Sequence, residues 1–462
     1  MYTEEKKSTY YLESAPIPKA IKHMAIPMIL AMVINTIYNI IDTYFIGLLN
    51  NTSMLAAVTL ALPFTTILMA IGDIFGTGGG TYISRLLGEK NISELKRVSV
   101  VNLYSSFMAG ILFIIICIPF VPSILWLLGA SGETLEHTKD FILVFLIGSP
   151  FVIANFTLGQ TVRAEGAAKE SMIGMIISVI VNVVLDPIFI FLLDMDVMGA
   201  AIATVISNIV SVAYYMYFLN EKSDIQSINI KYFKPSKEIY TNIFKIGISA
   251  FLLAFFLIIS SLLFNNYAMR YGDYVVAAFG IAQRIIQLSE FIGMGLFIGV
   301  VPLIAFAYAA KDYDRLKNVI KTTSVYLIGI TVGIGLILFF FREYVISLFS
   351  IDSNVIETGE NVLIAMLISS LFAACSGLIT SIFQALGEGK QSTIMSVARG
   401  ILLIPILLIA NNLFQLSGVI WSLPLCEIIA FIIGIILVTT FFYKTKNEKN
   451  RKFNETIKYY EI

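Results

Sequence analysis

Apolar residues occur along this chain in long runs that short polar connections separate. A helix needs about 20 consecutive apolar residues to cross the hydrocarbon core of a bilayer, and the runs reach that length. We therefore predict an all-α membrane protein with twelve transmembrane helices, at about 24–47, 55–83, 98–125, 141–162, 172–193, 199–219, 243–269, 275–310, 323–348, 361–385, 393–413 and 418–443. The eighth run is too long for one straight span, so this helix either extends out of the bilayer or breaks at Gly293, Gly295 or Gly299.

Basic residues are distributed unevenly between the two sides of this pattern. Most of the 31 lysine and arginine residues lie in the N-terminal segment, in the connections after even-numbered helices and in the C-terminal tail. The connections after odd-numbered helices, together with the helix ends beside them, carry only Lys139, Arg270 and Arg342. Basic segments stay in the cytoplasm, so we predict a multi-pass protein of the plasma membrane with both termini cytoplasmic.

The two halves of the chain repeat each other at an offset of 221 residues. The stretch RAEGAAKES (163–171) shares Ala, Gly, Lys and Ser in register with QALGEGKQS (384–392). This predicts an N-lobe at 23–220 and a C-lobe at 241–443, joined by a cytoplasmic linker at 221–240 and flanked by a cytoplasmic segment at 1–22 and a charged tail at 444–462. Because the offset joins an inner loop to an inner loop, the six-helix lobes are related by a pseudo-twofold axis along the membrane normal, as in some alternating-access transporters.

Two acids interrupt apolar helices of the N-lobe, where an ionisable group costs about 2.5–3.5 kcal/mol on insertion scales. Counting helical rise, Asp42, Asp186 and Thr204 all lie roughly 8–11 Å below the outer boundary. Tyr38 and Asn182 each precede one of the acids by one turn on the same helix face. Two adjacent carboxyls do not ionise together easily, so the pair could carry a proton, or release one when a cation arrives. The alternative is a static polar cluster that ties three helices together.

Other polar residues at depth are candidates for substrate binding. Glu290 and Gln287 lie near the middle of the eighth helix, Asn155 lies in the fourth and Glu427 in the twelfth. An acid facing a central cavity would suit a cationic substrate. The alternatives are structural: Glu290 could pair with Arg284 of its own helix, and Glu427 could have an ion-pair partner.

Several motifs together resemble the multidrug and toxic compound extrusion (MATE) family, and most closely its bacterial branch with an aspartate pair in the N-lobe. They are AIPMILAMVINTIYNIIDTYFIG (25–47), QTVRAEGAAKES (160–171), NVVLDPIFIF (182–191), GAAIATVISN (199–208) and QALGEGKQS (384–392). The resemblance covers nearly the whole chain. It implies a V-shaped two-lobe fold and a cation-coupled exporter of organic cations and amphipathic drugs, with the matching N-lobe residues forming the proton or sodium site.

One departure from the family bears on the coupling ion. Some members have acids in helices 7 and 10, where this chain has Asn265, Asn266, Ser376 and Ser381. A sodium site in the C-lobe is therefore not expected. In the N-lobe a carboxyl pair without obvious further oxygen ligands favours H⁺, although Na⁺ could bind Asp42, Asp186, Asn182 and Thr204. We expect no cofactor other than this ion.

The sequence gives weaker support to other functions. A flippase for lipid-linked precursors would share a related two-lobe fold, but twelve spans and acids at depth argue against it. The chain is 58% hydrophobic and has zero net charge, so nothing indicates a nucleic-acid partner. No nucleophile–base pair, metal cluster or nucleotide motif points to an enzyme. The run GTGGG (76–80) lacks a following GK[ST] and favours close helix packing instead of phosphate binding. The sequence leaves the substrate and the oligomeric state open.

Overall fold

The computed structural model of the protein describes residues 9–49 and 51–460, with side chains up to residue 444. The described chain contains helices and no strand, which confirms the predicted all-α fold. Residues 1–8 of the predicted N-terminal segment, and side chains of the predicted tail beyond residue 444, lie outside this description.

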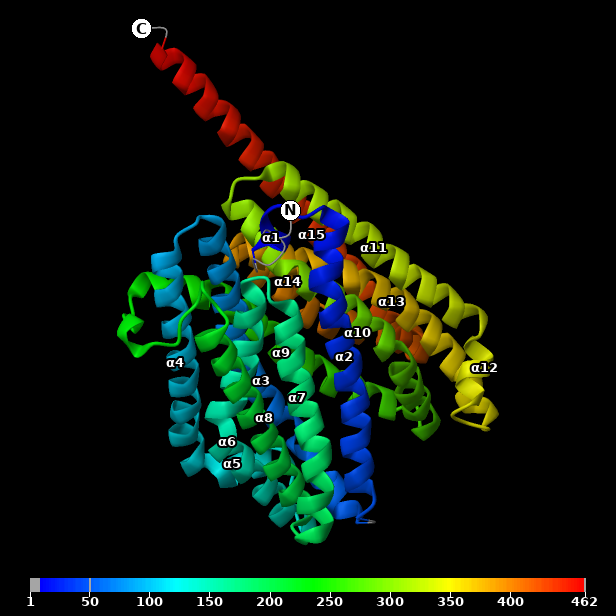
Figure 1. Ribbon diagram of the computed structural model, residues 1–462. Coiled ribbons are helices and arrows are strands. Elements are labelled where there is room, and N and C mark those ends of the chain that lie inside the picture. Colours follow the sequence, from blue (N-terminus) through cyan, green and yellow to red (C-terminus); the bar gives the residue numbers. More distant parts are fainter. Residues whose placement is uncertain (1–8, 50, 461–462) are drawn as a thin grey trace.

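The main N-lobe helices are α1 (Tyr10–Glu13), α2 (Ile17–Gly47), α3 (Thr52–Gly88), α4 (Ile92–Cys117), α5 (Val121–Leu127), α6 (Glu133–Ala164), α7 (Ala168–Pro187) and α8 (Asp196–Glu221) (Figure 1). Those of the C-lobe are α9 (Lys237–Met269), α10 (Asp273–Ala309), α11 (Tyr313–Phe340), α12 (Arg342–Ser347), α13 (Ser353–Leu386), α14 (Gly389–Ile401) and α15 (Leu403–Tyr460).

The described chain has 11 helical stretches that are long and apolar enough to span a bilayer. The last of them, Gly389–Lys444, contains a reversal at Gln415, where φ is 51° and ψ is −129°. A Cβ on Gly418 would lie 1.9 Å from the Ala410 carbonyl oxygen, so the chain folds back on itself there. The two arms correspond to the predicted spans 393–413 and 418–443, which brings the pattern to the twelve predicted spans. Helix α10 runs unbroken for 37 residues, so the predicted glycine break does not occur and the helix extends instead.

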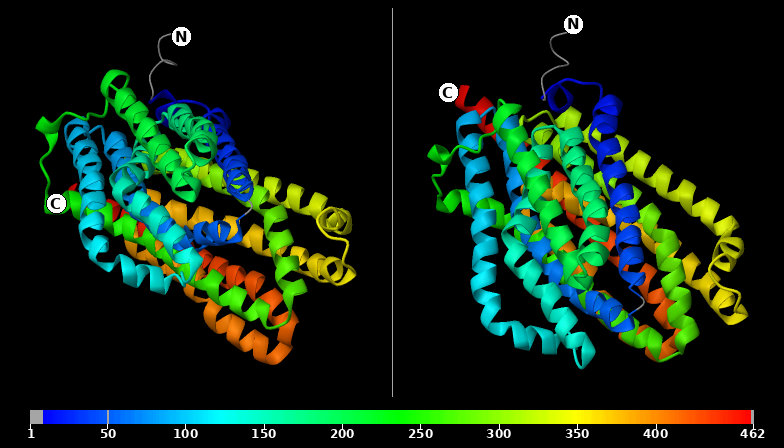
Figure 2. Two further views of the ribbon diagram at one scale, coloured as in Figure 1. Left: turned by 90° about the horizontal axis from the view of Figure 1, so that it is seen from below. Right: turned by 60° about the horizontal axis from the view of Figure 1, so that its bottom comes forward.

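The two lobes share a core at one end only. At the end where the described N-terminal residues lie, one apolar cluster combines N-lobe residues such as Leu12 and Ile83 with C-lobe residues such as Leu303. We call it the inner cluster. At the opposite end each lobe has its own core, one around Ile142 and one around Val362. The helices of the two lobes accordingly diverge away from the terminal end, which gives the V shape (Figure 1 and Figure 2).

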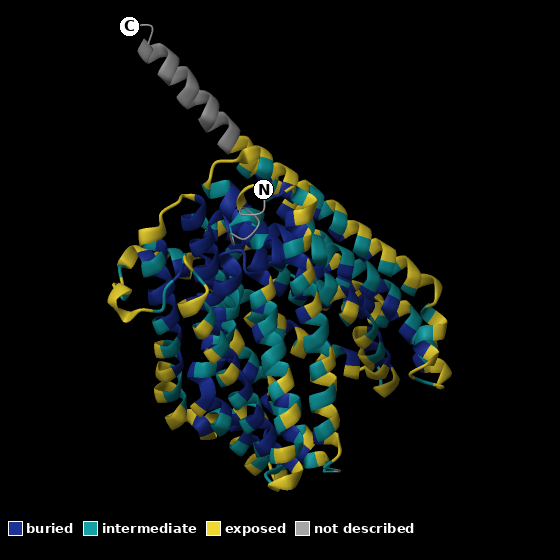
Figure 3. Ribbon diagram, viewed as in Figure 1, coloured by how far each residue is buried: buried dark blue, intermediate teal, exposed yellow. Residues whose placement is uncertain are grey.

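The outer faces of the helices expose apolar side chains. Ile115, Phe340 and Leu413 are more than half exposed, at 64%, 74% and 68%. Buried residues concentrate where the lobes meet near the terminal end (Figure 3). Apolar exposure on this scale matches a protein whose surroundings are lipid, in agreement with the multi-span pattern.

Glycines of α3 allow neighbouring backbones to approach it closely. A Cβ on Gly78 would lie 2.1 Å from the Ile243 carbonyl oxygen of α9, and one on Gly72 would lie 2.7 Å from Phe156 of α6. In the other direction, a Cβ on Gly247 of α9 would lie 2.2 Å from the Ile74 carbonyl oxygen. The GTGGG run therefore serves close helix packing, as predicted.

Hydrogen bonds hold the N-terminal segment against the C-lobe at the end of the molecule where the described N-terminal residues lie. Arg315 of α11 donates to the backbone carbonyls of Tyr11, Leu12 and Ala15, each at 2.9 Å, and so ties the N-terminal segment to the C-lobe. These bonds, together with the inner cluster, close the molecule at this end.

The linker between the lobes docks on a buried acid. Glu165, which follows α6, accepts from Ser223 Oγ at 2.6 Å and from Gln226 Nε2 at 3.0 Å. Burial raises the pKa of Glu165 to about 7, and these two hydrogen bonds act in the opposite direction.

Candidate functional site

The five polar residues that were predicted at similar depth in the N-lobe come together. Asp42 of α2 and Asp186 of α7 place their carboxyl groups in direct contact. Asn182, one turn before Asp186, donates from Nδ2 to Thr204 Oγ1 of α8 at 3.1 Å. The Tyr38 hydroxyl reaches the same threonine. We call this group, contributed by three helices, the N-lobe cluster.

The N-lobe cluster contains acceptors that lack donors. Among the described residues, both carboxylate oxygens of Asp186 and Oδ1 of Asn182 are buried without a hydrogen-bond partner. A buried acceptor without a donor is costly, and native proteins rarely keep one without a reason. A proton shared by the two carboxyls would supply a donor. A small hard cation such as Na⁺ would instead take these oxygens as ligands, so the side chains fit either ion.

The backbone changes at the acid of α7. The α-helix ends at Pro187, directly after Asp186, and the chain continues as a π-helical turn over Ile188–Leu192. Proline has no N–H to continue the helical hydrogen bonds, and a π turn has a wider backbone that recurs at functional sites. Asp186 therefore lies at a local irregularity of its helix.

A cavity of about 760 Å³ lies between the lobes and is lined by residues of both. That size is typical of a site for a drug-sized molecule. Tyr38 and Thr204 line it, whereas Asp42 and Asp186 do not. The N-lobe cluster thus lies behind the cavity wall and reaches the cavity through its tyrosine and threonine.

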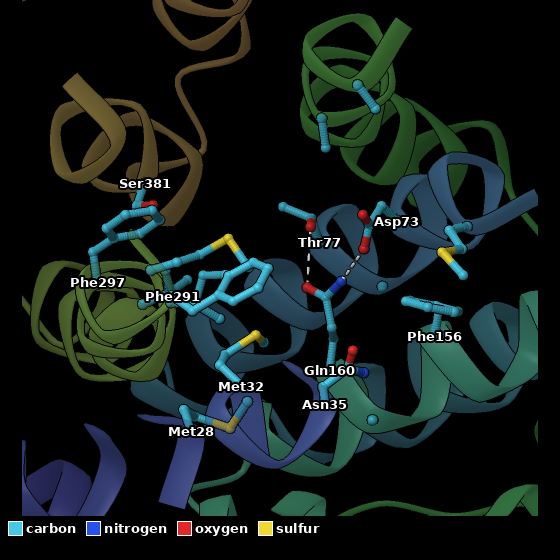
Figure 4. Close-up of a pocket in the computed structure, with 18 of the residues that line it drawn as sticks. Met28, Met32, Asn35, Asp73, Thr77, Phe156, Gln160, Phe291, Phe297 and Ser381 are labelled. Carbon is cyan, nitrogen blue, oxygen red and sulfur yellow. Dashed lines mark hydrogen bonds between the residues drawn. The ribbon is translucent and has the colours of Figure 1, made fainter. Parts of the chain in front are cut away.

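An acid that sequence reasoning missed also lines this cavity. Asp73 of α3 accepts a short hydrogen bond from Gln160 Nε2 of α6, and Gln160 Oε1 accepts from Thr77 Oγ1 at 3.0 Å (Figure 4). The buried Arg163, one turn after Gln160, donates to Gln160 Oε1 at 3.4 Å and is an electrostatic neighbour of Asp73. The available signal was a lone acid inside the apolar run 55–83.

The C-lobe wall carries two acids and one base. Glu427 pairs with Arg399 of α14, with Nε to Oε2 at 3.3 Å and Nη2 to Oε1 at 3.4 Å, so the structural alternative for Glu427 has a partner. Glu290 lines the same cavity and has Glu427, Arg399 and Gln283 as neighbours. Arg284, proposed above as its partner, is exposed and is not among those neighbours.

The remaining candidates differ in position. Asn155 lines the cavity and donates to Asn208 Oδ1 of α8 at 2.6 Å. Gln287 is half-buried on α10 and does not belong to the described cavity wall. The geometry therefore favours Asn155 over Gln287 as a residue that meets a ligand.

Comparison with known proteins gives consistent matches over the whole fold. The family model described as MatE matches residues 27–188 and 247–409, which is one segment in each lobe. The multidrug export protein MepA of Staphylococcus aureus (strain MSSA476) is 41% identical over 429 residues, covering 93% of this chain and 95% of that protein.

Solved structures share the fold. A crystal structure of MATE in complex with MaL6 is 26% identical with a TM-score of 0.89, covering 96% of this chain and 100% of that one. A multidrug resistance MATE family transporter of the MOP superfamily, solved in an outward-facing conformation, is 26% identical with a TM-score of 0.87, covering 94% of this chain and 98% of that one.

Proposed function

We propose that this chain, which belongs to the MATE family, is a cation-coupled antiporter that exports organic cations and amphipathic drugs by alternating access. Drug export is supported by the relationship to MepA, whose name describes multidrug export. We place the protein in the plasma membrane with both termini in the cytoplasm, on the basis of its basic inner loops. The membrane-embedded N-lobe cluster and the central cavity then have separate tasks.

One observation carries the coupling proposal: the N-lobe cluster and the cavity share residues. Tyr38 and Thr204 line the cavity, and behind them they contact the residues around the Asp42–Asp186 pair. A change of charge on the carboxyl pair can therefore alter the cavity wall without the ion and the drug competing for the same atoms. Antiport requires two sites whose occupancies bias one equilibrium in opposite directions.

The V shape suggests how the cycle runs. With the termini inside, the cavity of this conformation opens outward and the inner cluster closes the cytoplasmic end. A proton that enters from outside neutralises the carboxyl pair, and the π turn after Pro187 lets α7 and its neighbours adjust to this change. The lobes then separate at the inner cluster, and a drug can bind from the cytoplasm.

Proton coupling is favoured because one proton shared by the two carboxyls relieves their like-charge repulsion and supplies a donor between them. Sodium remains the competing ion, since the same oxygens suit it. The test is export of a drug from vesicles that contain the purified protein, with the proton gradient and the sodium gradient collapsed separately. We expect export to stop with the proton gradient. Export that stops only when the sodium gradient is removed would reverse this assignment.

The lipid-linked precursor flippase is the competing function. Its substrate carries a phosphate, and a cavity built for it would be basic. The described wall has three acids, Asp73, Glu290 and Glu427, against Arg163 and Arg399. The balance favours a cation. Binding of a polyprenyl phosphate, without binding of any organic cation, would establish the flippase instead.

A further inference from the structure

The acids around the central cavity are not equally available to a ligand. Asp42 and Asp186 lie behind the wall, and Glu427 is already held by both nitrogens of the Arg399 fork. Asp73 lies on the wall itself, and its hydrogen bond from Gln160 uses Oδ1 alone. Oδ2 remains for an interaction with a molecule in the cavity.

Close packing of two helices holds Asp73 in place. A Cβ on Gly76 of α3 would lie 2.8 Å from Gln160 Nε2, so only a glycine there lets the Gln160 side chain lie across α3 and reach Asp73. The amide is fixed at its other end as well, because Oε1 accepts from Thr77 at 3.0 Å and from Arg163 at 3.4 Å. Both the nitrogen and the oxygen of the Gln160 amide therefore have hydrogen-bond partners, and this fixes the orientation of the Asp73 carboxylate.

Arg163 provides the charge that keeps a lone acid tolerable beside an apolar cavity. Arg163 is 6% exposed and hydrogen-bonds to Gln160, which lies between it and Asp73. Its charge interacts electrostatically with the Asp73 carboxylate. A buried charge without compensation would be strongly disfavoured, whereas this one is balanced at a distance. The N-lobe cluster is different, because there the neighbour of each acid is another acid.

The surroundings of Asp73 suit an apolar molecule that carries a positive charge. Phe156, Met32 and Phe291 line the same cavity as Asp73, and in Figure 4 Met32 and Phe291 lie on the other side of Gln160 from it. Aromatic faces attract cations, and methionine side chains adapt to irregular apolar shapes. One carboxylate among such side chains gives charge selectivity without selecting a particular shape.

We propose that Asp73 binds the cationic group of the exported molecule on the N-lobe wall, with Gln160 and Arg163 as positioning residues. The inference rests on the proposed export of organic cations and assigns a residue for their recognition. It separates the drug-binding acid from the coupling acids within one lobe. A drug and a proton then occupy different carboxyls and influence each other through the intervening wall.

The test compares two compounds of similar shape and different charge. Tetraphenylphosphonium is a permanent aromatic cation, and triphenylphosphine oxide is a neutral analogue. Binding of both to the purified full-length protein in detergent is measured by titration calorimetry at one pH. For Asp73→Asn we expect at least a tenfold loss of affinity for the cation and less than a twofold change for the neutral compound. Asp73→Glu should retain most of the cation preference. Glu357→Gln, which changes an exposed acid in the first turns of α13, should behave as wild type.

Several outcomes would overturn the proposal. If Asp73→Asn binds the cation with an affinity within twofold of wild type, Asp73 does not recognise the cation. If the variant loses affinity for both compounds equally, the role of Asp73 is structural. Gln160→Leu should lower the cation-to-neutral affinity ratio, and an unchanged ratio contradicts its positioning role. Wild-type protein that binds neither compound would contradict the proposed function itself.

A second measurement uses the wild-type protein alone, so its result does not depend on whether a variant folds. A photoactivatable aryl azide that carries a phosphonium group is crosslinked to the wild-type protein and mapped by mass spectrometry. We expect labelling of α3 and α6 peptides around Asp73. Labelling confined to α10, α14 and α15 around Glu290 would place the cation on the C-lobe wall and refute the assignment.

Discussion

The two lobes share a sequence repeat, yet they accommodate acids at depth in different ways. In the N-lobe, Asp42 faces Asp186, and the oxygens of Asp186 have no donor. In the C-lobe, Glu427 faces Arg399, which donates two hydrogen bonds to it. The first arrangement offers free acceptors to a proton or a cation, whereas the second is satisfied by its own guanidinium.

This difference separates a site that can change its charge from one that keeps it. A carboxyl pair is destabilised when both groups are ionised, so its lowest free energy depends on what it has bound. A carboxylate–guanidinium pair is most stable when both partners remain charged, and losing one partner is costly. We therefore expect the two lobes to share a scaffold and the response to ions to lie in the N-lobe.

The largest expected effect is that of Asp186→Asn. The amide cannot release a proton, so coupled export should fall to the level of cells without the transporter. The measurement is drug efflux from cells, together with the expression level and thermal unfolding of the purified variant. Asp42→Asn should behave alike, because the two carboxyls act as one unit. Full export by either variant would place coupling elsewhere in the molecule.

The next effect concerns stability and contrasts the lobes directly. Arg399→Leu leaves Glu427, which is only 13% exposed on the cavity wall, without its partner, and this should cost up to about 3–5 kcal/mol. The double variant Arg399→Leu/Glu427→Gln should recover most of that loss, since neither charge then remains. Asp186→Asn, in contrast, removes a like-charge contact and should leave the thermal unfolding temperature unchanged or raised. Thermal unfolding in detergent gives all three values, and a stable Arg399→Leu single variant would contradict the contrast.

Part of this picture could be predicted from the sequence, for physical reasons that particular residues illustrate. Alternating helix direction and a constant rise per residue placed Asp42, Asp186 and Thr204 at one depth, and the structure brings them together. Depth says nothing about helix rotation or about distant partners. Pairing of Arg399 with Glu427 depends on the reversal at Gln415, which no hydropathy pattern marks.

Asp73 shows the same limit. Its partner Gln160 is 87 residues away and reaches it only because glycines bring α3 and α6 close together. Glycine-rich stretches predicted close packing but could not identify the helix that packs there. Hydropathy also underestimated helix length, because polar turns at the ends, such as the start of α6 at Glu133, are helical without being apolar.

A smaller effect should separate the proposed coupling acids, Asp42 and Asp186, from the cavity wall. Thr204→Val removes the hydroxyl that accepts from Asn182 while it preserves the volume of the side chain. We expect a drug affinity within about threefold of wild type and roughly a tenfold loss of coupled export. The reason is that no hydrogen bond then joins Asn182 of the N-lobe cluster to residue 204 of the cavity wall. The readouts are equilibrium drug binding and drug-induced proton release, measured on the same preparation. Equal losses in binding and export would mean that Thr204 simply contacts the drug.

The smallest effect comes from Glu165, a third kind of buried acid, whose side-chain hydrogen-bond partners are the neutral donors Ser223 and Gln226. Its pKa is about 7 in the folded protein against an ordinary 4.5, because burial penalises the charged form. The folded state therefore binds this proton more tightly than the unfolded state. The stability that Glu165 contributes is present below about pH 4.5 and is lost as the pH rises through about 7. Relative to Glu165→Gln, wild type should lose roughly 1–3 °C of unfolding temperature between pH 5 and pH 8. A difference between the two proteins that stays constant with pH would show that the linker docks on a permanently charged carboxylate, as a hydrogen-bonded analogue of the Glu427 site.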